Sequence, residues 1–333
     1  MPHRHFDEED RCQWMQQLPD EVRRRPLHSV LLPTTHDSAA YQLAQGRLAQ
    51  SKKSWAYWAE RFSRLPVVNR FQRAWTLTQN ASLFQQLVMG VRAFDLRLAY
   101  DERNHRFYFA HRFACTTAAF GIKEVKHFLD LYRGEVVLLF IKPDWENRGV
   151  LTAERATDFL GEATRILGDH LLPPTADNVL TDAHTIDALA ASGKRCVLYF
   201  SGKGGGTFVW KRSNITGAGF TADLDKRVEN LTAHLQRIKG QPTRNLHAIS
   251  LTLTPDNDLI VGALKRKLTC RGSEINSTEE LTELIHALRF ELLEEWVQRD
   301  LLDSLSLLAT DFVDIDFIDW VLNYNLDFRN GPV

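Results

Sequence analysis

Two histidines of this chain each follow a short apolar run that predicts a β-strand. His36, with Asp37 beside it, follows residues 28–32, and His111 follows residues 107–110. An imidazole titrates near neutral pH, so that such a histidine can take up or give up a proton in a reaction. Taken singly, each is more often a structural residue. Together, at the ends of different strands, they could act as the base and the acid of one reaction.

Three charged side chains are expected near these histidines. If residues 91–98 form a strand, Asp95 and Arg97 point to the same side, because side chains alternate along a strand with a period of two. Arg97 could bind a phosphate through its guanidinium while Asp95 holds it in place; alternatively, the two form only a buried ion pair. Lys142 follows residues 136–141, and it either contacts the same phosphate or merely extends toward solvent.

Two histidines and an arginine are the set that cleavage of a phosphodiester through a cyclic intermediate requires. One histidine removes a proton from an internal hydroxyl, the other protonates the leaving oxygen, and Arg97 stabilises charge at phosphorus. Asp311 ends the last apolar run and could orient a histidine. His105 competes with His111, but it lies in the polar stretch 101–106 and is expected to be exposed.

The elements that must position these residues alternate along the chain. Helical patterns occur at residues 121–132, 153–167, 223–238 and 278–302, the last as one helix or two. Apolar runs predict strands at residues 28–32, 91–98, 107–110, 136–141, 196–200, 246–251 and 305–312. The run 136–141 has no polar alternation, which indicates a parallel strand covered on both faces. The pattern predicts an α/β protein, and we favour a barrel.

The composition is that of a soluble globular protein. The 333 residues are 44% hydrophobic and 25% charged, and the formal net charge of −1 gives no basic bias toward nucleic acid. The four cysteines are widely spaced and predict neither a disulfide framework nor a zinc site. No apolar stretch follows Met1, so that no signal peptide is expected. We expect a cytoplasmic protein, at most peripheral to a membrane.

Residues 46–75 form a basic, aromatic segment. Glu60 is the one acid among residues 46–73, which are rich in lysine and arginine. The aromatic residues form one stripe of a predicted helix, and the candidates for membrane contact are Trp55, Trp58 and Phe62. A basic helix with an aromatic stripe suits an interfacial membrane contact. The alternative is an insertion whose aromatic side chains pack on the barrel, and both can hold at once.

Several segments, taken in order, resemble the phosphatidylinositol-specific phospholipase C X-domain family. The family includes small X-domain-only proteins, bacterial-type enzymes and glycosylphosphatidylinositol-cleaving phospholipases. The resemblance is carried by Leu32-Pro33-Thr34-Thr35-His36-Asp37-Ser38, Trp75-x-x-Thr78-Gln79-Asn80-x-Ser82-Leu83-x-x-Gln86-Leu87, Gly90-Val91-Arg92-x-Phe94-Asp95-Leu96-Arg97, Glu135-Val136-Val137-Leu138-Leu139, Leu253-Thr254-Pro255 and Asp311-Phe312-Val313.

The resemblance implies a distorted TIM barrel and a reaction. Residues 1–333 would form a single barrel domain, with the basic segment as an insertion at about residues 46–75. The implied substrate is a phospholipid at a membrane surface: phosphatidylinositol or a glycosylated relative. The implied products are diacylglycerol and an inositol cyclic phosphate. Nothing in the resemblance implies an oligomeric state.

The resemblance also gives each site residue a role. His36 would be the general base on the inositol hydroxyl, and Asp311 would hold His36. His111 would be the general acid, supported by Asp37. The residues expected to contact the substrate or to hold those that do are Arg97, Lys142 and Asp95.

No metal ion and no other cofactor is predicted. Calcium-dependent members of the family carry acid-x-acid where this chain has Asp95-Leu96-Arg97. A fixed guanidinium can take the place of the cation and would repel one.

Three positions depart from the family's pattern. Thr34 and Arg112 stand where glycine is usual, and Phe200 stands where bacterial members present an arginine to the inositol ring. The candidates to replace that arginine are Lys203, Lys211 and Arg212. These departures keep two alternatives open: a lipid-binding protein without turnover, and a related barrel phosphodiesterase that acts on another diester with a divalent ion.

Overall fold

The computed structural model describes residues 4–45, 48, 55–147, 149–211, 219–256, 258–260, 262–263 and 275–327, with only the backbone described at residues 55, 56 and 146. Its strands are β1 (Leu32–Thr35), β2 (Ala93–Asp101), β3 (Arg106–His111), β4 (Phe113–Thr117), β5 (Val137–Pro143), β6 (Cys196–Phe200), β7 (Val209–Lys211), β8 (Ala248–Leu251) and β9 (Leu307–Thr310).

These strands form one sheet with the order β7-β6-β5-β2-β1-β9-β8. Every pair along this path is parallel, while β3 runs antiparallel to both β2 and β4. Within the described part of the chain, no hydrogen-bonded ladder joins β7 to β8. The sheet is therefore an unclosed, distorted form of the barrel that the sequence predicts.

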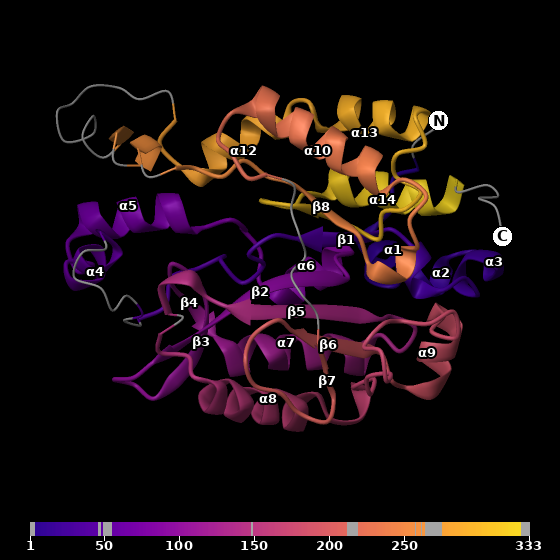
Figure 1. The fold of residues 1–333 in the computed structure, drawn as a ribbon, viewed down its shortest axis with the longest axis horizontal. Helices are drawn as coiled ribbons and strands as arrows, with labels where there is room; N and C mark the ends of the chain where they lie inside the picture. The colour runs from indigo at the N-terminus through magenta and orange to yellow at the C-terminus, as the bar shows by residue number, and fades with distance from the viewer. Residues whose placement is uncertain are drawn as a thin grey trace.

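Helices cover both sides of the sheet. The α-helices are α1 (Glu8–Cys12), α2 (Trp14–Gln17), α3 (Asp20–Arg23), α4 (Trp55–Arg61), α5 (Pro66–Thr76), α6 (Leu83–Met89), α7 (Ala118–Leu131), α8 (Ala153–Leu167), α9 (Ile186–Ser192), α10 (Leu224–Ile238), α12 (Thr278–His286), α13 (Arg289–Gln298) and α14 (Ile315–Asp327). Short 3-10 turns are η1 (Leu27–Ser29), η2 (Trp145–Asn147), η3 (Gly168–His170) and η4 (Thr243–Asn245). In Figure 1, α7, α8 and α9 lie on one side, and α10, α12, α13 and α14 lie on the other.

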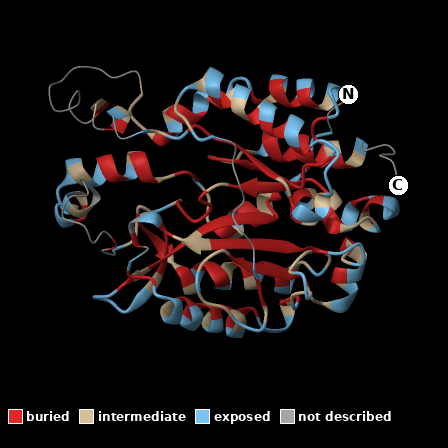
Figure 2. Cartoon of the chain, in the orientation of Figure 1, coloured by how far each residue is buried: buried red, intermediate tan, exposed pale blue. Residues whose placement is uncertain are grey.

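The core lies between the strands and these helices. Figure 2 shows the strands as buried and the outer faces of the helices as exposed. Strand β5 is buried at five successive positions, Val137–Ile141, as its unbroken apolar run predicts. Helix α8 begins at a Thr152 cap and buries one face through Phe159 and Leu160, which fits its period of 3.6 residues. None of the described helices is long and apolar enough to cross a membrane.

One predicted strand is displaced along the chain. The apolar run 28–32 does not form a strand over its length; residues 27–29 form the turn η1 instead, and β1 begins at Leu32. The turn is fixed because Ser29 donates from both its backbone N–H and its hydroxyl to the Pro26 carbonyl. Pairing with β9 then makes a strand of Leu32–Thr35, whose sequence is less apolar.

A buried ion pair at the amino-terminal ends of β2 and β5 ties the N-terminal helices to the sheet. Arg92 Nη2 lies 2.6 Å from Glu135 Oε2, and both side chains are fully buried. Arg92 also donates to the carbonyls of Arg11, Cys12, Leu87 and Val91. Glu135 accepts from the backbone N–H groups of Met15 and Gln16. Removing either charge would leave the other buried without its counter-ion.

We therefore expect Glu135→Ala to lower the free energy of unfolding by about 3–5 kcal/mol, because the guanidinium of Arg92 stays buried without its carboxylate. Denaturant unfolding measures this. Exposed Glu294 of α13 is the control, and its alanine variant should change stability by less than about 0.5 kcal/mol. Equal stabilities of the two variants would contradict the importance of the pair.

Candidate active site

The carboxyl ends of the parallel strands bring the predicted site residues together. His36 and Asp37 follow β1, and Asp311 follows β9, whose Thr310 carbonyl accepts from the His36 N–H at 3.0 Å. In β2 and β5, Arg97 lies opposite Lys142 in the register. His111 ends β3. Residues far apart in the chain meet here because β1, β5 and β9 are parallel and end at the same edge of the sheet, whereas the antiparallel β3 runs back along β2 and brings His111 to it.

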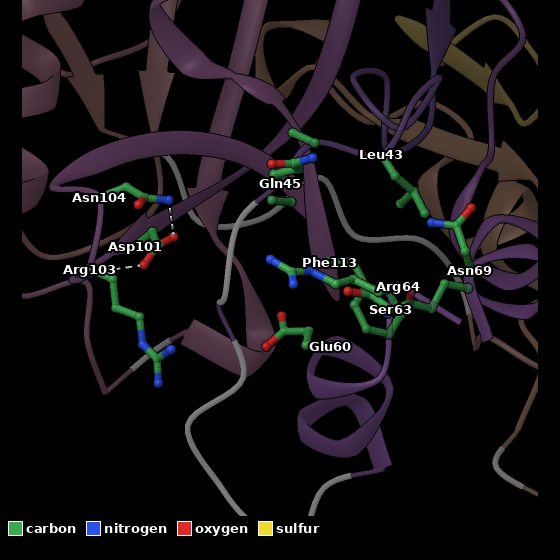
Figure 3. Close-up of a pocket in the computed structure, with 13 residues that line it drawn as sticks. Leu43, Gln45, Glu60, Ser63, Arg64, Asn69, Asp101, Arg103, Asn104 and Phe113 are labelled. Atoms are coloured by element: carbon green, nitrogen blue, oxygen red, sulfur yellow. Dashed lines mark hydrogen bonds between the residues drawn. The ribbon is translucent and has the colours of Figure 1, made fainter. Parts of the chain in front are cut away.

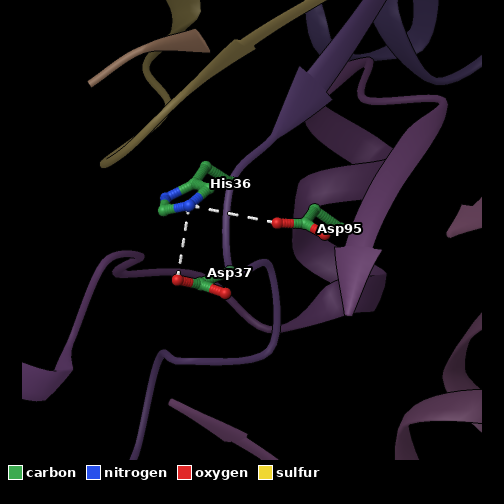
Figure 4. Close-up of side chains that lie close together, drawn as sticks. All are labelled: His36, Asp37 and Asp95. Atoms are coloured by element: carbon green, nitrogen blue, oxygen red, sulfur yellow. Dashed lines mark ion pairs between the residues drawn. The ribbon is translucent and has the colours of Figure 1, made fainter. Parts of the chain in front are cut away.

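The imidazole of His36 lies between carboxylates. Its Nδ1 is 3.0 Å from Asp311 Oδ1. Its Nε2 faces the other way, 3.4 Å from Asp37 Oδ2 and 4.0 Å from Asp95 Oδ2 (Figure 4). Asp311 thus fixes the orientation of the ring and directs Nε2 into the site.

His111 presents the same nitrogen to the same carboxylate. Its Nδ1 lies 2.7 Å from the Thr76 carbonyl, which can only accept, so that Nδ1 carries the proton. Its Nε2 lies 3.5 Å from Asp37 Oδ2. The two imidazoles therefore meet at Asp37 with their Nε2 atoms, and both Nδ1 atoms are held by other groups.

The two cations pair differently from the sequence-based expectation. Asp95 does not hold Arg97: its Oδ1 lies 2.8 Å from Lys142 Nζ, whereas Arg97 Nε lies 2.5 Å from Asp37 Oδ1. The backbone explains the exchange, because Asp37 adopts a left-handed conformation (φ 41°). Its carboxylate is buried and reaches Arg97, the nearest cation. Arg97 is 22% exposed, so that its Nη groups can still reach a bound anion.

The charges shift the protonation of both histidines. Burial by itself would lower the pKa of His36, but the surrounding carboxylates, Asp37 and Asp311 foremost, outweigh burial and raise it. Burial lowers the pKa of His111, with Arg97 adding to the effect and Asp37 opposing it. Burial would raise the pKa of Asp37, but Arg97 and then the histidines hold it well below its usual range. His36 is therefore protonated more readily than His111.

The same groups include a set of potential metal ligands. One ligand atom each from His36, Asp37 and Asp95 lies within 4.8 Å of the others. Both carboxylates already have a cation beside them, Arg97 and Lys142, and a divalent ion would have to displace or approach these charges. The donor set thus fits a metal poorly.

The structure accommodates the two positions where glycine is usual. Arg112 has φ 64°, the left-handed conformation that glycine adopts readily, and its N–H donates to Asp144 Oδ2 at 3.3 Å. Thr34 lies in β1 and is buried, and its hydroxyl donates to the Leu32 carbonyl at 3.0 Å. Neither substitution displaces His36 or His111 from the cluster.

Phe200 does not occupy a position that faces the site. It is fully buried and pairs with Ile141, whose side chain points to the face opposite Lys142. Its neighbour Ser201 falls on the face that carries Lys142. Lys203 is exposed in a loop that packs on α8, and no hydrogen bond or ion pair of the described residues joins it to the site. Its role in substrate binding stays a prediction. Arg212 lies outside the described residues.

The basic, aromatic segment forms two helices rather than one. Helix α4 ends at Arg61, and α5 begins at Pro66, because the first turn of a helix leaves the N–H that proline lacks without a partner. Phe62 therefore lies in the connecting turn. The rings of Trp58 and Phe62 are stacked with their centroids 6.3 Å apart, and each residue is 48% exposed. The side chain of Trp55 lies outside the described residues.

A pocket of about 500 Å³ is lined by residues other than those of the charged cluster (Figure 3). Its polar lining comes from the α4–α5 region, with Glu60 and Arg64, and from the β2–β3 hairpin, with Asp101 and Asn104. None of the predicted site residues lines it. Among the described residues, the candidate site is therefore identified by its chemistry.

Sequence reasoning assigned no role to several residues that contact the site. Thr76, Thr78 and Gln79 bind the histidines or the backbone beside them. Phe220, half-exposed, places its ring 6.2 Å from that of His36. The first three lie in or beside the Thr78-Gln79 part of a segment that carries the family resemblance, which was the available signal; for Phe220 no local pattern exists.

Solved structures with this fold are phosphatidylinositol-specific phospholipases C. The enzyme from Listeria monocytogenes aligns with a TM-score of 0.61 over 95% of this chain and 99% of its own, at 15% identity. A double mutant of the Staphylococcus aureus enzyme aligns with a TM-score of 0.63 over 97% of this chain and 99% of its own, at 16% identity. The predicted distorted TIM barrel of the phospholipase C type is thus confirmed.

Proteins that are similar in sequence are named PI-PLC X domain-containing proteins. The PI-PLC X domain-containing protein 2 of Homo sapiens is 28% identical over 128 residues, which are 38% of this chain and 41% of that protein. The PI-PLC X domain-containing protein 1 of Danio rerio is 29% identical over 137 residues, or 40% of this chain and 44% of that protein. The match thus spans less than half of these curated relatives. No family model matches the chain. Together, relatives and structures confirm the resemblance to the PI-PLC X-domain family.

The charge arrangement predicts the order in which the histidines titrate. In a histidine NMR titration, we expect the pKa of His36 to lie above the ordinary value of about 6.5 and that of His111 to lie below it. Asp311→Asn should lower the pKa of His36, because a carboxylate that favours the imidazolium is removed. Asp130→Asn, which alters a surface carboxylate beside His170, should leave it unchanged. A pKa of His36 below that of His111 would contradict this electrostatic account.

Proposed function

We propose that this protein is a metal-independent phospholipase C-type phosphodiesterase acting on phosphatidylinositol or a glycosylated relative. The observation that carries the proposal is the convergence of the His36 and His111 Nε2 atoms on Asp37, with Arg97 on the other oxygen of the same carboxylate. The phospholipase C fold supports the substrate class. A lipid-binding protein without turnover would have no need of two imidazoles held in this way.

The proposed reaction is an internal transfer. The inositol hydroxyl next to the phosphate gives its proton to His36 Nε2 as its oxygen bonds to phosphorus. The bond from phosphorus to the glycerol oxygen breaks, and His111 Nε2–H protonates that oxygen. Arg97 and Lys142 stabilise the charge on the phosphoryl oxygens. The products are an inositol cyclic phosphate and diacylglycerol.

This direction of proton transfer needs a neutral His36 and a protonated His111. In the protein without substrate, however, His36 is the histidine that is protonated more readily. A bound phosphodiester brings a negative charge next to Arg97 and His111. That charge raises the pKa of His111 and offsets the effect of Arg97 on it. Substrate binding thereby favours the protonated His111 that the reaction requires.

A membrane contact through α4 and α5 is part of the proposal. These helices lie on the side of the molecule to which the parallel strands point (Figure 1). Trp58 and Phe62 are half-exposed there, and Arg61 and Arg64 are exposed beside them. Aromatic side chains and arginines together favour an anionic lipid surface. A cytoplasmic location, inferred from the sequence, belongs to the proposal as well.

Incubation with phosphatidylinositol vesicles should yield diacylglycerol and inositol cyclic phosphate, with and without a calcium chelator. His36→Ala and His111→Ala should each lower the rate by about 10²–10⁴-fold, because each removes a proton-transfer group. His105→Ala is the matched control, since His105 lies in an exposed turn, and it should keep full activity. Product that appears only with added metal would favour a related diesterase instead. Vesicle binding without product would favour the lipid-binding protein.

Trp58→Ala and Phe62→Ala should each weaken binding to phosphatidylcholine vesicles that contain phosphatidylglycerol by about tenfold. A fully buried aromatic side chain contributes about 1.5–3 kcal/mol, and about 1.4 kcal/mol corresponds to tenfold. Leu131 at the end of α7 is 54% exposed, and Leu131→Ala should have no effect. Vesicle sedimentation measures the binding, and equal affinities of all three variants would contradict the assigned surface.

A further inference from the structure

Residues 76–79, at the end of α5 and just after it, contact three parts of the site. These are the loop after β1, the loop after β9, and His111. The Thr76 carbonyl, at the end of α5, accepts from His111 Nδ1–H at 2.7 Å. Thr78 Oγ1 donates to the Asp37 carbonyl at 3.1 Å. The segment is buried at three of its four positions, Thr76, Thr78 and Gln79. None of these contacts places it among the reacting groups, so its contribution is to their position.

Gln79 joins the two loops that hold the His36–Asp311 pair. Its Nε2 donates to the His36 carbonyl at 3.0 Å and to the Thr310 carbonyl at 3.1 Å. Its Oε1 accepts from the Val313 N–H at 3.1 Å. One fully buried amide therefore binds the backbone of His36 itself and the backbone on both sides of Asp311. Both donors and the acceptor of this side chain are used, which fixes its orientation.

Thr78 fastens two strained residues of the same loops. Asp37 and Phe312 have φ of 41° and 44°, a left-handed conformation that costs a non-glycine residue about 1–2 kcal/mol. The Asp37 carbonyl accepts from the Thr78 hydroxyl, and the Phe312 N–H donates to the Thr78 carbonyl at 2.6 Å. Such strain persists only where the surroundings determine the backbone, and here they include one residue that binds both loops.

We propose that Gln79 is a positioning residue, which sets the distance and angle between His36 and Asp311, with Thr78 as its accessory on Asp37. Without the amide, the loops after β1 and β9 share fewer bonds, and Asp311 loses its fixed place beside His36 Nδ1. The carboxylate would then orient the imidazole less well and raise its pKa less. The inference rests on the proposed function for its kinetic consequence and on geometry alone for the titration of His36.

The test uses two variants of Gln79. Gln79→Met keeps the volume and removes all three hydrogen bonds. Gln79→Glu keeps the acceptor for Val313 and sets a carboxylate oxygen against the His36 and Thr310 carbonyls. Each should lower kcat about 10–100-fold with little change in KM, as expected when catalytic groups are misplaced by about 1 Å. Gln79→Met, which adds no charge, should also lower the pKa of His36 in a histidine NMR titration.

A buried amide elsewhere provides the matched control. Asn325 of α14 is buried and makes the same three backbone bonds: it accepts from the Leu31 N–H and donates to the carbonyls of Leu31 and Val321. Its bonds to the backbone of Leu31 place it beside the amino-terminal end of β1, the end opposite the site. Asn325→Leu should destabilise the fold comparably and leave kcat and the pKa of His36 unchanged. Thr78→Val, which removes only a hydroxyl, gives a milder site variant if those at Gln79 do not fold.

The outcomes distinguish the positioning role of Gln79 from the proposed enzymatic function of the protein. A pKa of His36 that falls in Gln79→Met, or in Thr78→Val if Gln79→Met does not fold, and stays constant in Asn325→Leu supports the positioning role, even if the wild-type protein proves inactive on every lipid. An unchanged pKa of His36 in the folded variant that carries this test overturns it. Equal losses of kcat in the Gln79 and Asn325 variants also overturn it, because the effect would then follow stability and not position.

Discussion

The buried carboxylate of Asp37 is the constraint on which the rest of the site depends. A carboxylate away from water costs several kcal/mol unless opposite charges and hydrogen-bond donors surround it. Arg97 supplies a fixed positive charge at Oδ1, and both imidazoles approach Oδ2. Each of these groups is therefore held by the same buried charge, and the protonation of either histidine depends on the other two partners.

The barrel makes this arrangement attainable at low cost in chain entropy. The site residues come from the ends of β1, β3, β5 and β9 and from the interior of β2, which the hydrogen-bonded sheet holds at fixed spacings. The sheet needs no closure between β7 and β8 for this purpose, because the site lies on the consecutive strands β5, β2, β1 and β9 in the middle of the path and on β3 beside β2. A buried ion pair, Arg92–Glu135, anchors the opposite ends of β2 and β5. Rigid strand ends and short loops thus hold the imidazoles in place.

Much of the fold could be predicted where the pattern is local and strong. Helix α8 has the predicted bounds, and the strand around residues 137–141 is where its apolar run indicates. The strand expected at residues 28–32 was misplaced, since pairing with β9 selected the less apolar Leu32–Thr35. Strands β4 and β7 were missed: β7 has only three residues, and β4 is held by its hairpin with β3.

The sequence by itself determined the class of fold, the residue types of the site and their place at strand ends. Periodicity and motif spacing involve only a few neighbouring residues, so that both can be recognised in the sequence itself. Only the tertiary structure decided which cation pairs with which carboxylate, that Phe200 faces away from Lys142, and that Gln79 joins two loops more than 230 residues apart in the chain. These depend on strand register and on backbone angles such as that of Asp37, which long-range pairing fixes and which no local pattern encodes.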